Sequence, residues 1–592
     1  MRWMTWRWMT GMGILLAASC AMGAEPHRVL FNRIGPYATA VYVANADGTE
    51  ERPLLATPGV MDYNPAFSAD GLWVVLTSER EGSADLYRVD AGGTKLERLT
   101  NDPAYDDQAA FSPDGQRVVF VSTREGGRAH LWILDIATRT AKRLESGTVG
   151  GAWGDFRPAW SSDGEWIAFS SDREAKFQAA EGRWEQLHFV DIYVIRADGS
   201  GLRRLTTSGG ACGSPKWSAD STHLAVFCMP AEHSFDNRVV NPGGETLLGS
   251  IDVAAGTVEE IQMPPGEPAV KMAPAFVGPD RVGFVSKSPR GAGIYYSDGA
   301  SGPRGIVRSP SWTADGLQVV FHRIHSIAPV NWRKTWSKEA DFELILTKEM
   351  PAWNPTGERF VTTPLASRNL EVAEAGSSAS QVLYEDQGKT AMSPQWSPDG
   401  SEVAFGLGTF FVARARGAQV AVVKADGTGF RELTEGANNN GFPSYSPDGK
   451  QMVFRTLGPE GQGLRVMNLE DKSVRMLTDD YDNFPVWSPR GDLIVFTRQE
   501  DGDFELFTIR PDGSGLKRVT TAPGNEAHCA WSPDGEWIVF SSSRTGFKDE
   551  AIYTDSPQPY GELFVMRNDG SQARQLTDNQ WEDATPAWQP GR

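Results

Sequence analysis

Acidic side chains recur at one repeated position of the chain and are the first candidates for a functional site. Each stands five residues before an aromatic residue, here called the anchor; the six are Asp62, Asp106, Asp155, Asp482, Glu526 and Asp583. Gathered at one opening, they would attract a cation or a basic peptide segment. The alternative is a girdle of acid–arginine pairs between neighbouring repeats, since arginines stand thirteen residues after four anchors, at Arg80, Arg124, Arg173 and Arg544. Exposed pairs contribute only about 0.2–1 kcal/mol each, and we favour the girdle.

Histidines offer weaker chemistry. His233, His322 and His325 fall in two expected long connections, but their spacing is not diagnostic of metal ligands. We expect histidines exposed to solvent rather than a metal site, and no cofactor. The chain also lacks a Gly-x-Ser-x-Gly sequence, the turn that presents the nucleophile of α/β-hydrolases. No catalytic residue is assigned.

Two cysteines are expected to lie close together. Cys212 stands five residues before the anchor Trp217 and Cys228 eleven residues after it, which places them nearly opposite each other on an expected hairpin. A cross-strand disulfide there would contribute about 2–4 kcal/mol. Two buried free thiols are the alternative.

These positions belong to a unit that the chain repeats twelve times. The anchors are Phe67, Phe111, Trp160, Trp217, Phe276, Trp312, Trp353, Trp396, Tyr445, Trp487, Trp531 and Trp588. After an anchor the sequence predicts a tight turn, as in Ser397-Pro398-Asp399-Gly400, then two strands, an Asp-Gly turn and a short last strand. A four-stranded unit of about 45 residues cannot bury both faces alone, which is typical of a propeller blade.

The repeat resembles that of TolB-type propellers. The resemblance rests on the Trp-Ser-Pro-Asp-Gly turn, on Ser171-Asp172-Arg173 after the second strand and on the Asp-Gly turn before the last strand. It covers nearly the whole mature chain and implies a fold rather than an activity. We therefore expect an all-β protein of twelve four-stranded blades, arranged as two six-bladed TolB-like β-propellers. TolB proteins carry a small α/β domain before a single propeller, so membership of the Tol–Pal envelope system is not implied.

The grouping of the blades has two solutions. Repeats 1 to 3 and 10 to 12 share the acidic position, which predicts one propeller from residues 27–207 plus 440–592 and a second, inserted propeller from residues 208–439. The alternative is two sequential propellers, 27–310 and 311–592. Residues 28–56 predict strands that lack a first strand, and residues 584–588 predict a first strand without successors. We expect the two ends of the chain to complete one blade.

The N-terminus predicts export. Arg2 and Arg7 precede a short apolar run that ends near Met22, which is typical of a secretory signal peptide, here residues 1–24. Neither this run nor any later one is long enough for a membrane-spanning helix. Cys20 resembles a lipoprotein processing site, which is the alternative to ordinary cleavage. The formal net charge of −19 disfavours nucleic acids and anionic membranes as partners. We expect a periplasmic or secreted monomer.

Long connections between the second and third strands of several repeats predict a binding face. They carry Trp184, Trp332, Trp336, Tyr553 and Tyr560. Aromatic residues on loops of a rigid frame are typical of interfaces; the alternative is that they only pack their own loops. The sequence thus predicts an exported, non-catalytic propeller protein that binds a protein or peptide partner of the cell envelope through this face. The alternative function is a propeller lyase or hydrolase that acts on a polymer, with or without a metal ion.

Overall fold

The computed structural model is built from strands and turns. It describes residues 26–591 except 37, 56, 58, 145–152, 176–188, 231–245, 265–269, 279–280, 287–290, 327–330, 387, 410–416, 460, 501–502, 546–548 and 551–560. In this part of the chain, forty-eight strands form twelve four-stranded sheets, which confirms the expected all-β fold of twelve blades. Within the described part of the chain, no helix is both long and apolar enough to cross a membrane. The expected signal peptide and Cys20 lie outside the described residues.

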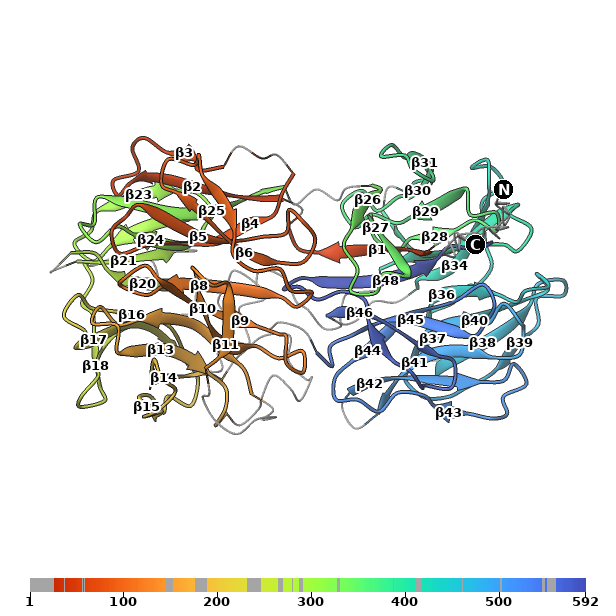
Figure 1. Cartoon of the computed structure of the whole chain (residues 1–592). Helices are drawn as coiled ribbons and strands as arrows, with labels where there is room; N and C mark the ends of the chain where they lie inside the picture. Colours follow the sequence, from red (N-terminus) through yellow and green to blue (C-terminus); the bar gives the residue numbers. More distant parts are fainter. Residues whose placement is uncertain are drawn as a thin grey trace, which may run out of the picture.

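Propeller I contains blades 1 to 6 and lies on the left of Figure 1. The strands of each blade are called A to D from the channel outward. In that order they are β4 (Asp62–Phe67), β5 (Trp73–Ser78), β6 (Asp85–Asp90) and β7 (Leu96–Arg98) in blade 1; β8 (Asp106–Phe111), β9 (Arg117–Ser122), β10 (His130–Asp135) and β11 (Thr140–Arg143) in blade 2; β12 (Asp155–Trp160), β13 (Trp166–Ser171), β14 (Asp191–Arg196) and β15 (Arg203–Arg204) in blade 3; β16 (Ala211–Trp217), β17 (His223–Met229), β18 (Leu247–Asp252) and β19 (Thr257–Glu260) in blade 4; β20 (Lys271–Phe276), β21 (Val282–Ser286), β22 (Gly293–Tyr296) and β23 (Ser301–Arg304) in blade 5; and β24 (Val307–Trp312), β25 (Gln318–Ser326), β2 (Ala38–Asn45) and β3 (Arg52–Pro53) in blade 6.

Propeller II contains blades 7 to 12. Its strands, again A to D, are β28 (Ala352–Trp353), β29 (Arg359–Thr362), β30 (Leu370–Glu374) and β31 (Gln381–Tyr384) in blade 7; β32 (Thr390–Trp396), β33 (Glu402–Gly408), β34 (Gln419–Lys424) and β35 (Arg431–Glu432) in blade 8; β36 (Asn439–Tyr445), β37 (Gln451–Gly458), β38 (Gly461–Asn468) and β39 (Val474–Met476) in blade 9; β40 (Asp482–Trp487), β41 (Ile494–Glu500), β42 (Asp503–Ile509) and β43 (Lys517–Arg518) in blade 10; β44 (Glu526–Trp531), β45 (Trp537–Ser542), β46 (Glu562–Arg567) and β47 (Arg574–Gln575) in blade 11; and β48 (Glu582–Trp588), β1 (His27–Ile34), β27 (Phe342–Thr347) and β26 (Arg333–Thr335) in blade 12.

The blades follow the chain, which corrects the inserted layout. β12 of blade 3 contacts β16 of blade 4, where that layout placed a boundary between propellers, and β4 contacts β24 to close propeller I. The sequential boundary at residue 310 is also displaced, because it falls within β24 and the described strands change propeller between residues 326 and 333. The acidic pattern misled the grouping because three of its members belong to each propeller.

The N-terminal strands are divided between the two propellers. β1 lies between β48 and β27, antiparallel to the first and parallel to the second, so the two ends of the chain do share blade 12. β2 and β3 instead complete blade 6 beside β25. Figure 1 shows β1, in red, reaching into the right-hand propeller while β2 remains in the left-hand one. Each propeller is therefore closed by a strand from the first 53 residues.

Local hydrogen bonds explain the repeated turn between strands A and B. In blade 8 the Ser397 hydroxyl donates to Asp399 at 2.6 Å and accepts from the Glu402 N–H at 3.0 Å. Gly400 donates its N–H to the Ser397 carbonyl at 2.9 Å and has a φ of 71°, where glycine is favoured. The hydrogen bond from Ser397 lowers the pKa of Asp399. The hydrogen bonds that form this turn therefore lie within residues 397–402.

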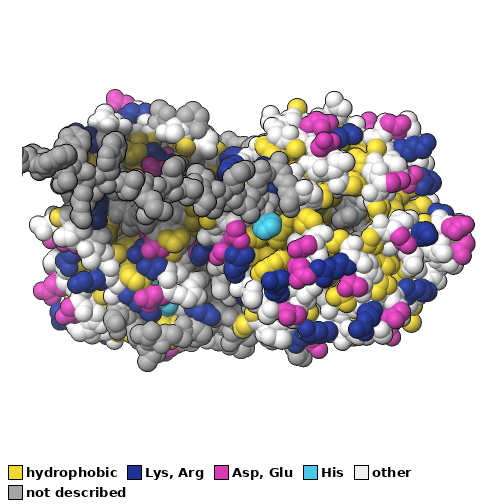
Figure 2. Space-filling model, turned by 45° about the vertical axis from the view of Figure 1, so that its right-hand side comes forward, with side chains coloured by type: hydrophobic (Ala, Val, Ile, Leu, Met, Phe, Trp, Pro, Cys, Tyr) yellow, Lys and Arg dark blue, Asp and Glu magenta, His cyan; other side chains and the backbone are white. Residues whose placement is uncertain are grey.

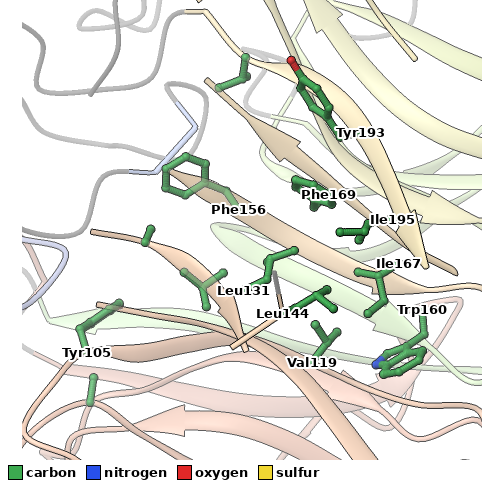
Figure 3. Packing of buried hydrophobic residues seen from close by; sticks show 14 of the residues in the cluster. Tyr105, Val119, Leu131, Leu144, Phe156, Trp160, Ile167, Phe169, Tyr193 and Ile195 are labelled. Carbon is green, nitrogen blue, oxygen red and sulfur yellow. The ribbon is translucent and has the colours of Figure 1, made fainter. Parts of the chain in front are cut away.

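Apolar side chains fill the spaces between neighbouring blades. Figure 3 shows Val119 and Leu131 of blade 2 facing Phe156, Ile167 and Phe169 of blade 3. Tryptophan anchors also donate hydrogen bonds to the preceding blade. Such indole N–H groups, at 3.0–3.2 Å from a strand A carbonyl, belong to Trp217, Trp353 and Trp531. Each blade is thus held by both neighbours, as expected for a propeller.

The ends of the two propellers that carry the B–C connections and the links between successive blades face each other. The Thr123 hydroxyl of propeller I donates to Asp578 of propeller II at 2.9 Å. The indole of Trp336 lies against Gly82, and Trp581 packs on the cluster between blades 2 and 3. This end of each propeller, called the loop end, is therefore turned toward the other propeller. The opposite end, which carries the A–B turns, is called the turn end.

Candidate functional site

Each blade presents one residue in the left-handed backbone conformation to the channel, three positions before the anchor. Their φ angles lie between 44° and 55°. Where strand A spans this position, its pairing with strand B slips, for example between Phe156 and Ala159. The residues, called the channel residues, are Asn64, Gln108, Arg157, Ser214, Ala273 and Ser309 in propeller I and Met350, Ser393, Phe442, Phe484, His528 and Thr585 in propeller II. Bulges with such angles cost energy and recur at functional sites.

The channel of propeller II opens at the turn end as an uncharged funnel of about 430 Å³. All six channel residues of this propeller line it, together with anchors and eleven prolines. Among the described residues that line the funnel there is no Asp, Glu, Lys or Arg. Figure 2, which turns the right-hand side of the molecule forward, shows hydrophobic side chains interspersed with charged ones over the right-hand half.

An aromatic row crosses three blades in this funnel. Phe484 makes edge-to-face contacts with Phe442 at 4.7 Å and with His528 at 4.4 Å between ring centroids. Burial lowers the pKa of His528 to about 4, so its ring is neutral at neutral pH. The funnel thus offers an uncharged aromatic surface.

The channel of propeller I is polar. The Asn64 side-chain amide donates to Asp107 at 2.8 and 2.9 Å and accepts from Ser309 at 2.6 Å. The Arg157 N–H donates to Gln108 at 2.7 Å, and the Arg157 guanidinium donates to Ser309 at 3.1 Å. These bonds connect blades 1, 2, 3 and 6 around the channel.

Two acidic residues of propeller II occupy this polar channel. Asp549 and Glu550 follow β45 of blade 11. Asp549 is paired with Arg157 and accepts a hydrogen bond from Gln108 at 3.1 Å. Glu550 is fully buried and accepts from the Ser170 hydroxyl at 2.6 Å and from the Ser214 N–H and hydroxyl at 2.8 and 2.6 Å. A pocket of only about 50 Å³ remains beside the channel residues of propeller I.

Burial shifts the pKa of both charge types in this channel. It raises the pKa of the Glu550 carboxyl, which Arg157 opposes. It lowers the pKa of Lys216 to about 8, an effect that Arg157 strengthens and Glu550 opposes. The occupied channel therefore holds Arg157 and Lys216 beside Asp549, Glu550 and the buried Asp107.

The six acids of the repeated position do not line an open mouth. All are buried, and each is paired with an arginine, for example Asp62 with Arg80 at 2.8 Å and Asp583 with Arg33 at 2.7 Å. The other pairs are Asp106–Arg124, Asp155–Arg173, Asp482–Arg498 and Glu526–Arg544. The girdle is the better description, with one correction: each pair joins strand A to strand B of the same blade, or to the residues that directly follow that strand B, rather than to a neighbouring blade.

The expected loop aromatics are used inside the molecule where the structure describes them. Trp332 packs edge-to-face on Trp353 at 6.0 Å, and Trp336 lies against Gly82 of the other propeller. Trp184, Tyr553 and Tyr560 lie outside the described residues. Trp332 therefore packs inside propeller II and Trp336 contacts propeller I; both lie next to β26, where the chain passes from blade 6 to blade 12, and not between strands B and C of one blade.

The remaining candidates separate clearly. His322 is buried and accepts a hydrogen bond from the Asn64 N–H at 3.2 Å, which corrects the expectation that it is exposed to solvent. His233 and the side chain of His325 lie outside the described residues. Within the described residues, no three His, Cys, Asp or Glu side chains gather as metal ligands.

Cys212 and Cys228 are opposite each other in register and are disulfide bonded.

Sequence reasoning missed the channel residues. Ten of the twelve directly precede a proline, as in Arg157-Pro158 and Phe484-Pro485, and this spacing to the anchor was a readable signal. The acids Asp549 and Glu550 carry no comparable signal, because their partners lie in another propeller. Arg157 and Asp549 are 392 positions apart.

Comparison with known proteins agrees with the geometry of the blades. The profile of the TolB beta propeller domain matches residues 107–241 and 300–514, which is more than half of the chain. The chain is 32% identical over 149 residues to the protein TolB homolog of Chlorobium luteolum, a match that covers 25% of this chain and 34% of that protein. It is 27% identical over 165 residues to the uncharacterized peptidase YuxL of Bacillus subtilis, covering 27% of this chain and 23% of that protein.

Solved structures match more weakly. TolB from Acinetobacter baumannii gives a TM-score of 0.27 at 13% identity over 82% of each chain. The tricorn protease gives a TM-score of 0.30 at 13% identity over 87% of this chain and 44% of that one. The chain covers about a third of the length of the TolB homolog and less of the peptidase. With its twelve blades and its profile match, the chain belongs to the TolB beta propeller domain family.

Proposed function

We propose that this chain is an exported, non-catalytic pair of propellers that binds an uncharged, extended segment of a protein partner in the funnel of propeller II. The single observation that carries this function is the lining of the funnel. It is aromatic and proline-rich, with serine, threonine and glutamine among the prolines, and its described lining has no acidic or basic side chain. Apolar anchors in concave sites dominate many protein interfaces.

The class of ligand follows from the size and charge of the site. Removing apolar surface from water contributes about 25 cal/mol per Å², or about 1.5–3 kcal/mol for one large apolar side chain. A charged segment would lose hydration without gaining a partner. A volume of about 430 Å³ admits side chains of a peptide rather than a folded domain.

Propeller I supports a peptide as the occupant. Its channel already holds a chain segment, Asp549 and Glu550, with backbone and side-chain contacts. The same fold can therefore receive a chain segment in the channel. The lining then decides whether that segment is acidic or apolar.

Export rests on the leader that the sequence predicts at residues 1–24, and the envelope partner rests on export. The binding end differs from the face expected from sequence. The described loop ends of the two propellers are turned toward each other, whereas the funnel opens at the turn end of propeller II.

A peptide selection tests the function. A random peptide library displayed on phage is selected against the full mature chain, and selected peptides are measured by fluorescence anisotropy. We expect neutral sequences with aromatic or branched apolar residues. The variant Phe484→Asn should bind them at least about tenfold more weakly, while asparagine tolerates the left-handed backbone at this position.

The matched control is Val474→Ser, because Val474 is 50% exposed on the outer strand β39, away from the funnel. It should leave the affinity unchanged. Selected peptides that bind Phe484→Asn as tightly as the unmodified protein would place the binding site elsewhere.

A further inference from the structure

We propose that the channel of propeller I is a binding site for acidic peptide segments with adjacent carboxylates, and that Asp549 and Glu550 occupy it as a ligand that the chain itself supplies. The site is separate from the funnel of propeller II. The two acids receive hydrogen bonds or ion pairs from blades 2, 3 and 4. This geometry distinguishes the two carboxylates, because Asp549 meets a guanidinium and Glu550 meets hydroxyl and backbone N–H donors.

The donors are not required by the fold. Positions equivalent to the channel residues carry Met350, Phe442 and Phe484 in propeller II, with the same backbone angle. The channel position of a blade therefore accepts apolar side chains with the same backbone. Gln108, Arg157 and Ser214 stand in propeller I where such residues would serve, and each donates to the acidic segment. Their polar groups therefore bind the occupant in addition to the bonds that Arg157 makes with Gln108 and Ser309.

Charge supports the same conclusion. The chain has a formal net charge of −19, which on average repels acidic ligands. The residues that line the remaining pocket of propeller I nevertheless include Arg157 and Lys216 and no acid. Two cations with little access to water attract carboxylates more strongly than exposed ones do.

The occupant is tethered rather than built into the propeller that it fills. Asp549 and Glu550 belong to the connection between β45 and β46 of blade 11, in the other propeller. A tethered ligand competes at an effective concentration of about millimolar. An acidic peptide from a partner would have to displace it, so the intact protein should bind such a peptide weakly.

The test uses a fluorescent nine-residue peptide with the sequence of residues 545–553, Thr-Gly-Phe-Lys-Asp-Glu-Ala-Ile-Tyr. Its affinity is measured by anisotropy for the unmodified chain and for the double variant Asp549→Ala/Glu550→Ala. We expect the variant to bind the peptide at least about tenfold more tightly, because the internal competitor is gone. A peptide with Asn-Gln in place of Asp-Glu should not bind. Adding Arg157→Met to the double variant should remove at least about nine tenths of the affinity.

A second variant covers the case in which the alanine variant does not fold. Asp549→Asn/Glu550→Gln keeps the shape of both side chains, and circular dichroism and thermal unfolding confirm the propellers. The proposal is overturned if the folded variants bind the acidic peptide no better than the Asn-Gln peptide. In that case the contact serves only to join the propellers. It is also overturned if Arg157→Met leaves the affinity of the double variant unchanged.

Discussion

The channels of propeller I and propeller II differ in chemistry although each is lined by six residues with the same left-handed backbone. Propeller I presents amide, hydroxyl and guanidinium groups to Asp549 and Glu550, and a pocket of about 50 Å³ remains there. Propeller II presents Phe442, Phe484 and His528 to an open funnel of about 430 Å³. The bulge therefore directs the channel residue toward the channel in every blade. The type of that residue can differ between blades, and it determines which ligand the channel can bind.

This difference also shows how the propellers are coupled. Propeller II supplies the segment that fills propeller I, and the N-terminal strands close both. The loop ends are engaged with each other, whereas the funnel of propeller II opens away from the junction. A ligand of the funnel can be bound without separating the propellers.

The largest expected effect comes from breaking the ion pair in the filled channel. Arg157→Met leaves the Asp549 carboxylate, whose side chain is 9% exposed, without its cation. We expect the free energy of unfolding to fall by about 3–5 kcal/mol, as found when one member of a buried pair is removed. Thermal and urea unfolding followed by circular dichroism measure the loss.

Two variants serve as controls for this loss. Arg196→Met removes a pair with Glu165 that is 47% and 63% exposed, and it should cost no more than about 1 kcal/mol. The double variant Arg157→Met/Asp549→Leu should recover much of the stability, because no unpaired charge stays buried. Equal losses for Arg157→Met and Arg196→Met would mean that the buried pair in the channel of propeller I contributes no more to stability than an exposed pair.

The disulfide of blade 4 should account for the next largest effect. Cys212 and Cys228 are 16 positions apart, and a loop of this length contributes about 3 kcal/mol. Reductant should therefore lower the unfolding temperature of the unmodified protein and leave that of Cys212→Ala/Cys228→Ala unchanged. In the unreduced, denatured mature protein, thiol counting should find Cys529 alone; three free thiols would contradict the bond.

The two channels should respond to acid with opposite signs. Burial lowers the pKa of His528 to about 4, below the value of about 6.5 in an unfolded chain. The unfolded state therefore takes up the proton first, and the stability that neutral His528 contributes, at most about 3 kcal/mol, is lost as the pH falls from 6.5 toward 4. Burial raises the pKa of Glu550, so its folded state takes up the proton first and gains stability as the pH falls.

Single substitutions separate these two responses. His528→Asn should flatten the acid loss, and Glu550→Gln should remove the opposing gain, as measured by urea unfolding between pH 4 and pH 7. The titration of His528, followed by NMR of its imidazole protons, should have its midpoint well below 6.5. A midpoint at the ordinary value would show that the funnel is hydrated like bulk solvent.

The blades could be predicted from the sequence because their determinants are local. Ser397, Asp399 and Gly400 specify their turn through hydrogen bonds within six residues, and the same phrase recurs along the chain. The blade grouping could not be predicted from the acidic residues. Each acid pairs with an arginine of its own blade, as Asp106 does with Arg124, so the pattern says nothing about which blades are neighbours.

The candidate sites divide in the same way. The channel positions are readable as the residue before a proline near the anchor, and their types give the chemistry of each lining but not whether the channel is open. The occupation of the channel of propeller I by Asp549 and Glu550 could not be predicted from the sequence. Arg157 and Asp549 are far apart in the chain and come into contact only when both propellers have formed. The disulfide could be predicted from the sequence, since Cys212 and Cys228 lie opposite each other on one hairpin.

The smallest expected effect tests whether the propellers differ only in their channels. Gly164 of propeller I and Gly400 of propeller II occupy the same turn position, with φ angles of 74° and 71°. An added Cβ would meet a proline of the preceding blade at 3.7 and 3.6 Å, an ordinary contact, so the cost of Gly→Ala is backbone strain alone. We expect each variant to lose about 1–2 kcal/mol of unfolding free energy, by the same amount in both propellers. Unequal losses in urea unfolding would show that the difference between the propellers extends into their frames, and the lining could then no longer be treated as independent of the blade.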